Sequence, residues 1–303
     1  MDSEKNFFKK LSIIDFLNLT VLIFFIVFYI IGFTKTPYKG TLAIWYLLLF
    51  LFIIFISRLR QSKKDFWGKK FLFLAYPMIF FFSLFESIFM LLPYFNTFRF
   101  DDLMINIDYF LCGVHPTIWI EKIINPTLTE IMFISYFFYF PMPLILFILL
   151  FYRKQYKDIE ESIFLLFITY YSAYITYFFV PVEGPRFHLA HLQSVPLTGL
   201  FLSKPIMSLI DFFEPNKLDC FPSLHAAIML VTMYITFRNA KKLFYFYLPF
   251  AFLIMISLVY CRFHYVIDII AGTALAIICV TLGRMLYLKF RNKFIFHFNN
   301  PKV

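Results

Sequence analysis

The sequence predicts an all-α, polytopic membrane protein, a bundle of about eight transmembrane helices without a soluble domain. Hydrophobic residues make up 61% of its 303 residues, charged residues make up 15%, and the mean hydropathy is +0.78. Soluble domains are about 45–50% apolar and about 25% charged. The apolar residues also come in long runs, and a helix of about 20 such residues crosses the hydrocarbon core of a bilayer.

Eight runs of this kind are rich in Phe, Leu and Ile and contain few charges. The first run is longer than the apolar region of a usual signal peptide, and no small-residue cleavage site follows it, so we expect it to remain as a membrane helix. The second and sixth runs are the shortest. The expected spans are 14–33, 41–57, 70–93, 129–152, 161–180, 222–237, 243–260 and 264–288.

The positions of Lys and Arg predict how these spans are oriented, because cytoplasmic loops are enriched in both residues. With the N-terminus inside and the spans alternating, 20 of the 28 basic residues fall in inside segments and 8 fall outside. This split predicts that both termini are cytoplasmic. Most of the basic residues therefore lie in short loops that face anionic membrane lipids, and this accounts for the formal net charge of +10. We expect no nucleic-acid partner.

The two longest outside connections, 94–128 and 181–221, contain most of the unusual polar residues. The first is acidic at its start and then mixes apolar and polar residues, which fits either a helix in the membrane interface or a simple covering loop. The second contains Arg186, His188 and His191. The two histidines suggest a metal pair by count, but no third ligand has a suitable spacing, so we interpret them as substrate contacts or plain loop residues.

Two further clusters lie at the ends of predicted spans. His225 stands at the start of the sixth span, where an ionisable residue needs a polar partner or a wet cavity. His264 and Asp268 are four residues apart at the start of the eighth span, so on a helix they share a face. A carboxylate beside an imidazole fixes its tautomer and stabilises its charged form. Gly272 and Ala276 continue this face and let another helix approach closely.

The connectivity brings these clusters to the same outer side of the membrane. Five residues can therefore converge on one pocket: Arg186, His225, Arg262, His264 and Asp268. Arginine forks bind phosphate oxygens, one histidine can attack phosphorus, and the other can protonate the leaving oxygen. This set suits phosphoryl transfer. No carboxylate cluster of the kind that holds magnesium accompanies it, so we expect neither a metal nor another cofactor.

At these residues the chain resembles the type 2 phosphatidic acid phosphatase superfamily, whose members share a six-helix core. The family motif P-S-G-H corresponds to Pro222-Ser223-Leu224-His225, with Leu in place of Gly. The last motif, S-R-x5-H-x3-D, aligns with Ser257-Leu258 followed by His264 and Asp268, so a leucine replaces the family's arginine. The closest stretch is His264-Tyr265 together with D-I-I-A-G from Asp268 to Gly272.

The departures from the family motifs form a pattern of their own. An arginine stands at Arg262 instead of position 258, and the first motif, K-x6-R-P, survives only as Arg186, with Phe179 at the lysine position. F-P-S-L-H together with R-x-H-Y-x-x-D is typical of the inositolphosphotransferase-like branch. The same branch shows the earlier pattern Asp108, Gly113 and Pro116.

The resemblance covers roughly 100–288 and implies three parts. These are accessory transmembrane helices at 1–93, a phosphatase or phosphotransferase core with an interfacial helix at 94–288, and a cytoplasmic tail at 289–303. It also implies a metal-independent phosphohistidine mechanism in which His264 attacks phosphorus, Asp268 orients it, and His225 is the general acid. The equatorial phosphate oxygens would be held by Arg186, Arg262 and Ser223.

The predicted function is therefore a lipid phosphate phosphatase, embedded in membrane lipids, with its site at the extracytoplasmic (periplasmic or lumenal) face. The first alternative is a phosphotransferase that moves a phosphate-bearing headgroup to a lipid or glycan alcohol, like inositol phosphorylceramide synthase. A transporter is an alternative of a different class, although the chain shows no broken-helix pair repeated across two halves.

Ser223 can cap the sixth span, bind phosphate, or do both. The four cysteines form no C-x-x-C pair, and a disulfide stays open.

Overall fold

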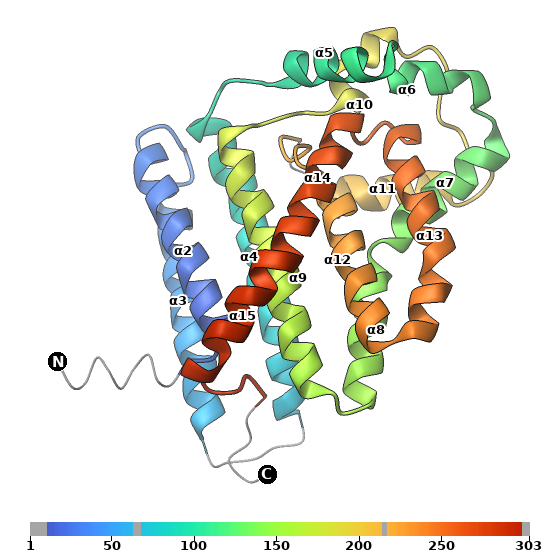
Figure 1. Ribbon diagram of the computed structural model, residues 1–303. Coiled ribbons are helices and arrows are strands. Elements are labelled where there is room, and N and C mark those ends of the chain that lie inside the picture. The colour runs from blue at the N-terminus through green and yellow to red at the C-terminus, as the bar shows by residue number, and fades with distance from the viewer. Residues whose placement is uncertain (1–10, 63–67, 214–216, 299–303) are drawn as a thin grey trace. The chain divides into compact units, whose positions relative to one another are not determined.

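The computed structural model describes residues 11–62, 68–213 and 217–298 (Figure 1). Within these ranges the chain is helical, with isolated β-bridges but no strand, which confirms the all-α prediction. Parts of the predicted 1–93 region and of the predicted 289–303 tail lie outside the described residues.

Six helical runs among the described residues are long and apolar enough to cross a membrane. Two bent helix pairs raise this number to eight if each pair is one span, which confirms the predicted number of about eight. The set differs from the predicted one, because it includes the pair at 101–123 and does not include 222–237. The six runs are α2 (Ile13–Gly32), α3 (Lys39–Gln61), α4 (Lys69–Phe95), α9 (Tyr156–Phe179), α13 (Lys241–Tyr260) and Val266–Lys293, which contains α14 (Val266–Ile278) and α15 (Arg284–Phe290).

The two bent pairs change direction within a few residues. In the first pair, α5 (Asp101–Cys112) and the segment Pro116–Ile123 meet at 64°; in the second, α7 (Pro126–Phe138) and α8 (Pro141–Tyr152) meet at 44°. The second pair covers the predicted span 129–152. A proline begins α8, and proline has no backbone N–H to continue the helical hydrogen bonds, which explains the break.

The predicted span 222–237 corresponds to α12 (Leu224–Asn239), a helix of only 16 residues. It packs against α13 and α14, and the three helices lie side by side in Figure 1. Most of its side chains are buried, so α12 lies among other helices, and lipid reaches little of it. Gly272, on α14, lets α12 and α14 approach closely at the start of α12, because a Cβ on Gly272 would overlap the carbonyl oxygen of Ser223. The predicted close approach of another helix at Gly272 is thereby confirmed.

The chain forms two compact units. The first contains the described residues up to Phe95 together with 154–171 and 279–298. The second contains 96–153 and 172–278, which includes every predicted site residue. The predicted division into 1–93, 94–288 and 289–303 stays a prediction.

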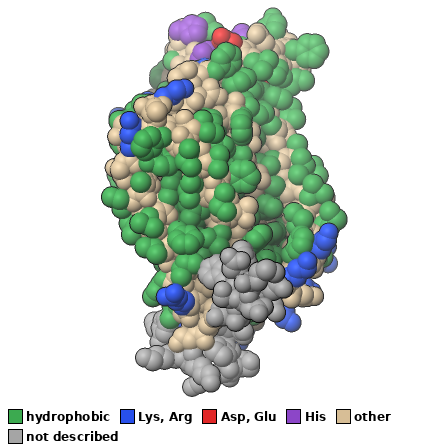
Figure 2. All heavy atoms as spheres, turned by 90° about the vertical axis from the view of Figure 1, so that its left-hand side faces the viewer, with side chains coloured by type: hydrophobic (Ala, Val, Ile, Leu, Met, Phe, Trp, Pro, Cys, Tyr) green, Lys and Arg blue, Asp and Glu red, His purple; other side chains and the backbone are tan. Residues whose placement is uncertain are grey.

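Apolar side chains face outward along the helices of the first unit. Ile23 and Ile30 on α2, and Ile44 and Leu48 on α3, are all exposed. Figure 2 shows the side of the molecule that carries these helices, where hydrophobic side chains follow the helices and Lys and Arg lie near the ends. Contiguous exposed apolar surface of this kind is expected where a protein contacts lipid.

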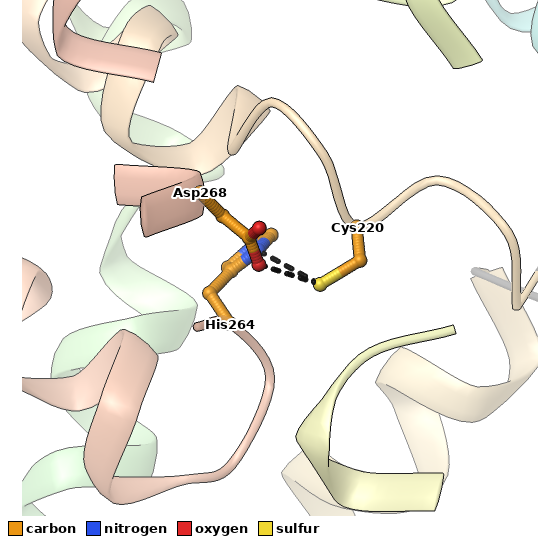
Figure 3. Close-up of side chains that lie close together, drawn as sticks. All are labelled: Cys220, His264 and Asp268. Carbon is orange, nitrogen blue, oxygen red and sulfur yellow. Dashed lines mark hydrogen bonds and ion pairs between the residues drawn. The ribbon is translucent and has the colours of Figure 1, made fainter. Parts of the chain in front are cut away.

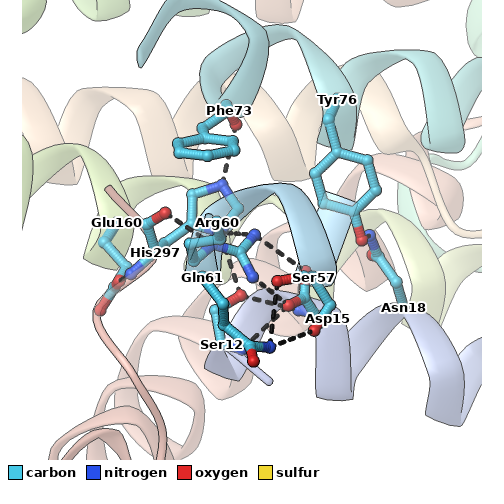
Figure 4. Close-up of polar contacts among 10 residues, drawn as sticks. All are labelled: Ser12, Asp15, Asn18, Ser57, Arg60, Gln61, Phe73, Tyr76, Glu160 and His297. Atoms are coloured by element: carbon cyan, nitrogen blue, oxygen red, sulfur yellow. Dashed lines mark hydrogen bonds and ion pairs between the residues drawn. The ribbon is translucent and has the colours of Figure 1, made fainter. Parts of the chain in front are cut away.

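A buried polar network stabilises the interior of the first unit (Figure 4). Arg60 forms an ion pair with Asp15, and both side chains are fully buried. Arg60 Nε also donates a hydrogen bond to the carbonyl oxygen of His297 at 2.8 Å, and the backbone N–H of His297 donates to Glu160. Nε2 of His297 lies 2.8 Å from the carbonyl oxygen of Phe73. The network therefore fixes the C-terminal segment against α3, α4 and α9.

Removing the charge at Arg60 is expected to destabilise this unit, because Asp15 would keep a buried and unpaired carboxylate. We expect Arg60→Ala to lower the free energy of unfolding by about 3–5 kcal/mol, measured by thermal unfolding of the detergent-solubilised protein. Arg58→Ala is the matched control, since Arg58 lies on the same helix and is exposed. Equal stability of the two variants would contradict a structural role for the network.

Candidate active site

A tight turn between α13 and α14 presents His264. Helix α13 ends at Tyr260, and Arg262 in the turn has a φ of 65°, in the left-handed region that non-glycine residues rarely adopt. The backbone N–H of His264 then donates to the carbonyl oxygen of Leu258 at 3.0 Å. Because α14 begins only at Val266, His264 stands just before the helix instead of on its first turn.

Acidic side chains of α5 fix this turn and the neighbouring loop. Asp108 accepts hydrogen bonds from the backbone N–H groups of Val266 and Ile267, each at 2.8 Å, and so caps the start of α14. Asp101 accepts the N–H of Gly184 at 2.9 Å and the hydroxyl of Tyr265 at 3.2 Å. The 94–128 connection therefore contains helices that organise the site; its depth in the membrane interface stays a prediction.

His264 lies between His225 and Asp268. Its Nδ1 is 3.5 Å from Oδ2 of Asp268, and its Nε2 is 3.3 Å from Nδ1 of His225. All three side chains are buried. The structure thus brings together the three residues for which the sequence predicts catalytic roles, with a different partner on each ring nitrogen of His264.

The carboxylate of Asp268 is fully buried. Its Oδ2 accepts hydrogen bonds from the backbone N–H of Tyr265 at 2.8 Å and from the thiol of Cys220 at 2.9 Å. Its Oδ1 is buried and has no hydrogen bond among the described residues. A buried carboxylate held in this way is fixed in position and favours a positive charge on the adjacent imidazole.

His225 is positioned by the start of α12. The hydroxyl of Ser223 accepts the N–H of Ala226 at 3.3 Å, so Ser223 is the N-cap, as one of its predicted roles required. The backbone N–H of Ser223 donates to the carbonyl oxygen of Asp268 at 3.0 Å, which joins α12 to α14 at the site. Phosphate binding by Ser223 stays a prediction.

Two tyrosines enclose His225. The ring of Tyr136 on α7 is centred 4.6 Å from the imidazole, and the ring of Tyr139, at the end of the same helix, is centred 4.4 Å from it. These ring contacts fix the orientation of the imidazole. The sequence indicated neither residue, because two tyrosines among 20 carry no local signal. Only the position of α7, which packs against α13 and α11, brings them to His225.

Arg186 is connected to the same aromatic group through Phe263. It belongs to the short helix α10 (Pro185–His188), and its guanidinium is centred 5.7 Å from the ring of Phe263, which stacks on Tyr136 at 4.3 Å. Its two terminal nitrogens bind the carboxylate of Asp211 at 2.7 and 3.1 Å. Asp211, on α11 (Ser203–Phe213), is a residue that the sequence analysis missed.

The guanidinium of Arg262 is directed towards Glu121. Its Nη2 donates to Oε1 of Glu121 and to the carbonyl oxygen of Val195, both at 2.6 Å, and its Nη1 donates to Gln193 at 3.3 Å. Its Nε is buried without a hydrogen bond among the described residues. Burial lowers the pKa of Arg262, and the ion pair with Glu121 opposes this shift. Phosphate binding by Arg262 stays a prediction.

The remaining sequence candidates lie outside this cluster. His188 contacts Asp102 at 3.1 Å on the surface, and His191 is exposed on a short 3-10 helix. None of the four cysteines, all of which lie among the described residues, forms a disulfide. Within the described residues, one group has the donor atoms of a metal site, namely Cys220, His264 and Asp268, whose donor atoms lie within 4.8 Å of one another (Figure 3).

A family model of the PAP2 superfamily matches residues 111–282, more than half of the chain. No curated protein and no solved structure matches the chain. The chain therefore belongs to the PAP2 superfamily, the type 2 phosphatidic acid phosphatases, as its motifs indicated. Membership and the apolar helices establish an integral multi-pass membrane protein and support a phosphatase-type or phosphotransferase-type function on lipid phosphates.

The cap on α14 can be tested separately from chemistry. Asp108→Ala removes the acceptor for two N–H groups and is expected to lower the free energy of unfolding by about 0.5–2 kcal/mol. Asp102→Ala is the control on the same helix, because the side chain of Asp102 is 88% exposed and surface pairs contribute little. Thermal unfolding in detergent measures both; a loss in Asp102→Ala as large as in Asp108→Ala would contradict the capping role.

Proposed function

We propose that this protein is a metal-independent lipid phosphate phosphatase that acts through a phosphohistidine intermediate. The observation that carries the proposal is the placement of His264 between a buried carboxylate and a second histidine. With the proton on Nδ1, facing Asp268, the Nε2 atom keeps its lone pair on the side of His225. That atom is the nucleophile.

In the first step, Nε2 of His264 attacks phosphorus and the bond from phosphorus to the lipid oxygen breaks. Asp268 stabilises the positive charge that develops on His264, and protonated His225 donates its proton to the leaving alcohol. In the second step, neutral His225 takes a proton from water, the water oxygen attacks phosphorus, and the P–N bond breaks to release phosphate. The rings of Tyr136 and Tyr139 pack against His225 and hold its orientation through both steps.

Three residues are proposed to hold the equatorial oxygens: Arg186, Arg262 and Ser223. Arg186 is the most accessible of them, and phosphate would replace Asp211 on its two terminal nitrogens. Arg262 would contribute through Nε, since its other nitrogens already bind Glu121, Val195 and Gln193. The N–H groups at the start of α12 add positive potential there.

The proposed location of the site is the extracytoplasmic face, with cytoplasmic termini, because 20 of the 28 basic residues then lie inside. A second candidate is a phosphotransferase of the inositolphosphotransferase-like branch. The motif F-P-S-L-H at 221–225 and the motif R-x-H-Y-x-x-D at 262–268 favour it. The two functions share the first step and differ in the acceptor, which is water in one and an alcohol in the other.

The catalytic roles predict a sharp loss of phosphate release on substitution. His264→Ala is expected to reduce turnover to background, and His225→Ala to reduce it by about 10²–10⁴-fold through loss of general acid catalysis. The assay measures phosphate released from a panel of lipid phosphates in detergent, with and without candidate alcohols. His188→Ala is the control: this histidine is half-buried, contacts Asp102 outside the cluster, and its loss should leave turnover unchanged.

Each outcome of this assay has a definite meaning. Turnover by His264→Ala or His225→Ala comparable to the wild-type protein would overturn the mechanism. Free inorganic phosphate in the presence of alcohols supports the phosphatase, whereas a new phosphorylated lipid or glycan without free phosphate supports the phosphotransferase.

The pair between Arg186 and Asp211 predicts a gain on substitution. Asp211→Asn removes a carboxylate that competes with phosphate for Arg186, and an exposed pair of this kind is worth up to about 1 kcal/mol, so KM should fall by up to about fivefold. The measurement is the KM for the lipid phosphate that the panel identifies. The same fall in an Arg186→Ala background would show that Asp211 acts by another route and would contradict the prediction.

A further inference from the structure

We propose that Cys220, His264 and Asp268 form an inhibitory binding site for a thiophilic divalent cation of the Zn²⁺ class. The cation site is argued from the geometry of the three side chains. Its inhibitory effect rests on the proposed function, because His264 and Asp268 belong to both sites.

The donor atoms are already spaced as ligands of one ion. Sγ of Cys220 lies 3.4 Å from Nδ1 of His264 and 2.9 Å from Oδ2 of Asp268, and Nδ1 and Oδ2 are 3.5 Å apart. Tetrahedral Zn²⁺, with ligands at its usual distances, separates such atoms by about 3.3–3.6 Å. Two of the three separations fit, and only the separation between Sγ and Oδ2 must widen by about half an ångström.

The chemistry of the donors selects the class of ion. A thiolate, an imidazole and a carboxylate suit Zn²⁺ or Cd²⁺, whereas Mg²⁺ and Ca²⁺ prefer oxygen ligands alone. Three protein ligands leave one tetrahedral position, which water or the carbonyl oxygen of Phe263, 3.2 Å from Sγ, can supply. Two of the three ligand residues also have hydrogen-bond partners that hold them in place. Nε2 of His264 has His225 as its partner, and Oδ2 of Asp268 accepts the N–H of Tyr265.

The backbone around Cys220 leaves room for the sulfur. Gly184 has a φ of 93°, and a Cβ at this position would lie 2.9 Å from Sγ and 3.2 Å from the carbonyl oxygen of Phe263. A larger residue would push the thiol out of the cluster. Cys220 is itself buried, so its sulfur is directed at His264 and Asp268 instead of at solvent.

Binding of the cation releases one proton from the site. The thiol of Cys220 now donates its proton to Asp268; the ion takes the place of that proton, which leaves to solvent as the thiolate binds. Nδ1 of His264 gives its lone pair to the ion, so the ring proton must sit on Nε2. The atom that attacks phosphorus then has no lone pair to offer, and Asp268 is occupied by the ion. The site is therefore inactive while the cation is bound.

Direct metal binding tests the site without any activity assay. Full-length protein in detergent is treated with a chelator, dialysed against Zn²⁺, and its zinc content is measured by mass spectrometry. Wild-type protein and Cys261→Ala should each retain about one Zn²⁺ per chain more than Cys220→Ala. Cys261 is the matched control, because it is also buried and free but lies outside the cluster. Equal zinc content in wild-type protein and Cys220→Ala overturns the site.

A spectroscopic measurement reports on the sulfur itself. With Co²⁺ in place of Zn²⁺, wild-type protein should show a thiolate-to-cobalt charge-transfer band that is absent in Cys220→Ser. This conservative variant also decides the result if Cys220→Ala fails to fold. A band of equal strength in Cys220→Ser overturns the assignment of Cys220 as a ligand.

The inhibitory consequence has its own test. Zn²⁺ should suppress phosphate release, a chelator should restore it, and Cys220→Ala should require at least about tenfold more Zn²⁺ for the same inhibition. Zinc binding without inhibition overturns the inhibitory role. If metal-free wild-type protein releases no phosphate from any lipid tested, the proposed function fails, whereas the dialysis and cobalt results still decide the cation site.

Discussion

The buried carboxylate of Asp268 is the group around which the second unit is organised. A charge without exposure to water needs partners from the protein, and two segments supply three of them to its Oδ2, while Oδ1 has no hydrogen bond among the described residues. The turn gives the N–H of Tyr265, the loop before α12 gives the thiol of Cys220, and His264 lies alongside. The backbone carbonyl of Asp268 accepts the N–H of Ser223, which is the N-cap of α12, so this hydrogen bond fixes the start of α12 beside Asp268.

Carboxylates that accept backbone N–H groups recur throughout the chain. Asp108 caps α14, Asp101 holds the loop at 183–184, and Glu130 accepts N–H groups from the segment 200–203 at the start of α11. In the first unit Glu160 accepts the N–H of His297. Each of these acids fixes a segment that would otherwise carry unsatisfied backbone groups away from water. The rigid placement of the site loops follows from acidic residues that take no part in the proposed chemistry.

The sequence predicted the membrane helices because hydrophobicity over about 20 residues is a local property. It located His225, His264 and Asp268 because their motifs are contiguous. It did not indicate Tyr136 or Asp211, since the packing of α7 and α11 selects them and no spacing encodes it. The direction of the Arg262 side chain was equally out of reach, because its partner at position 121 is 141 residues away.

The contact between Gly272 and Ser223 sets the spacing of the site by backbone against backbone. A Cβ at Gly272 would meet the backbone of Ser223 and the Cβ of Ala226, and neither of these groups can rotate away to change the separation of α12 and α14 at this level. The exposed apolar side chains of α13 and α14 take no part in this contact. The separation of His225 and Asp268 and the exposed apolar surface of the bundle are therefore set by different atoms.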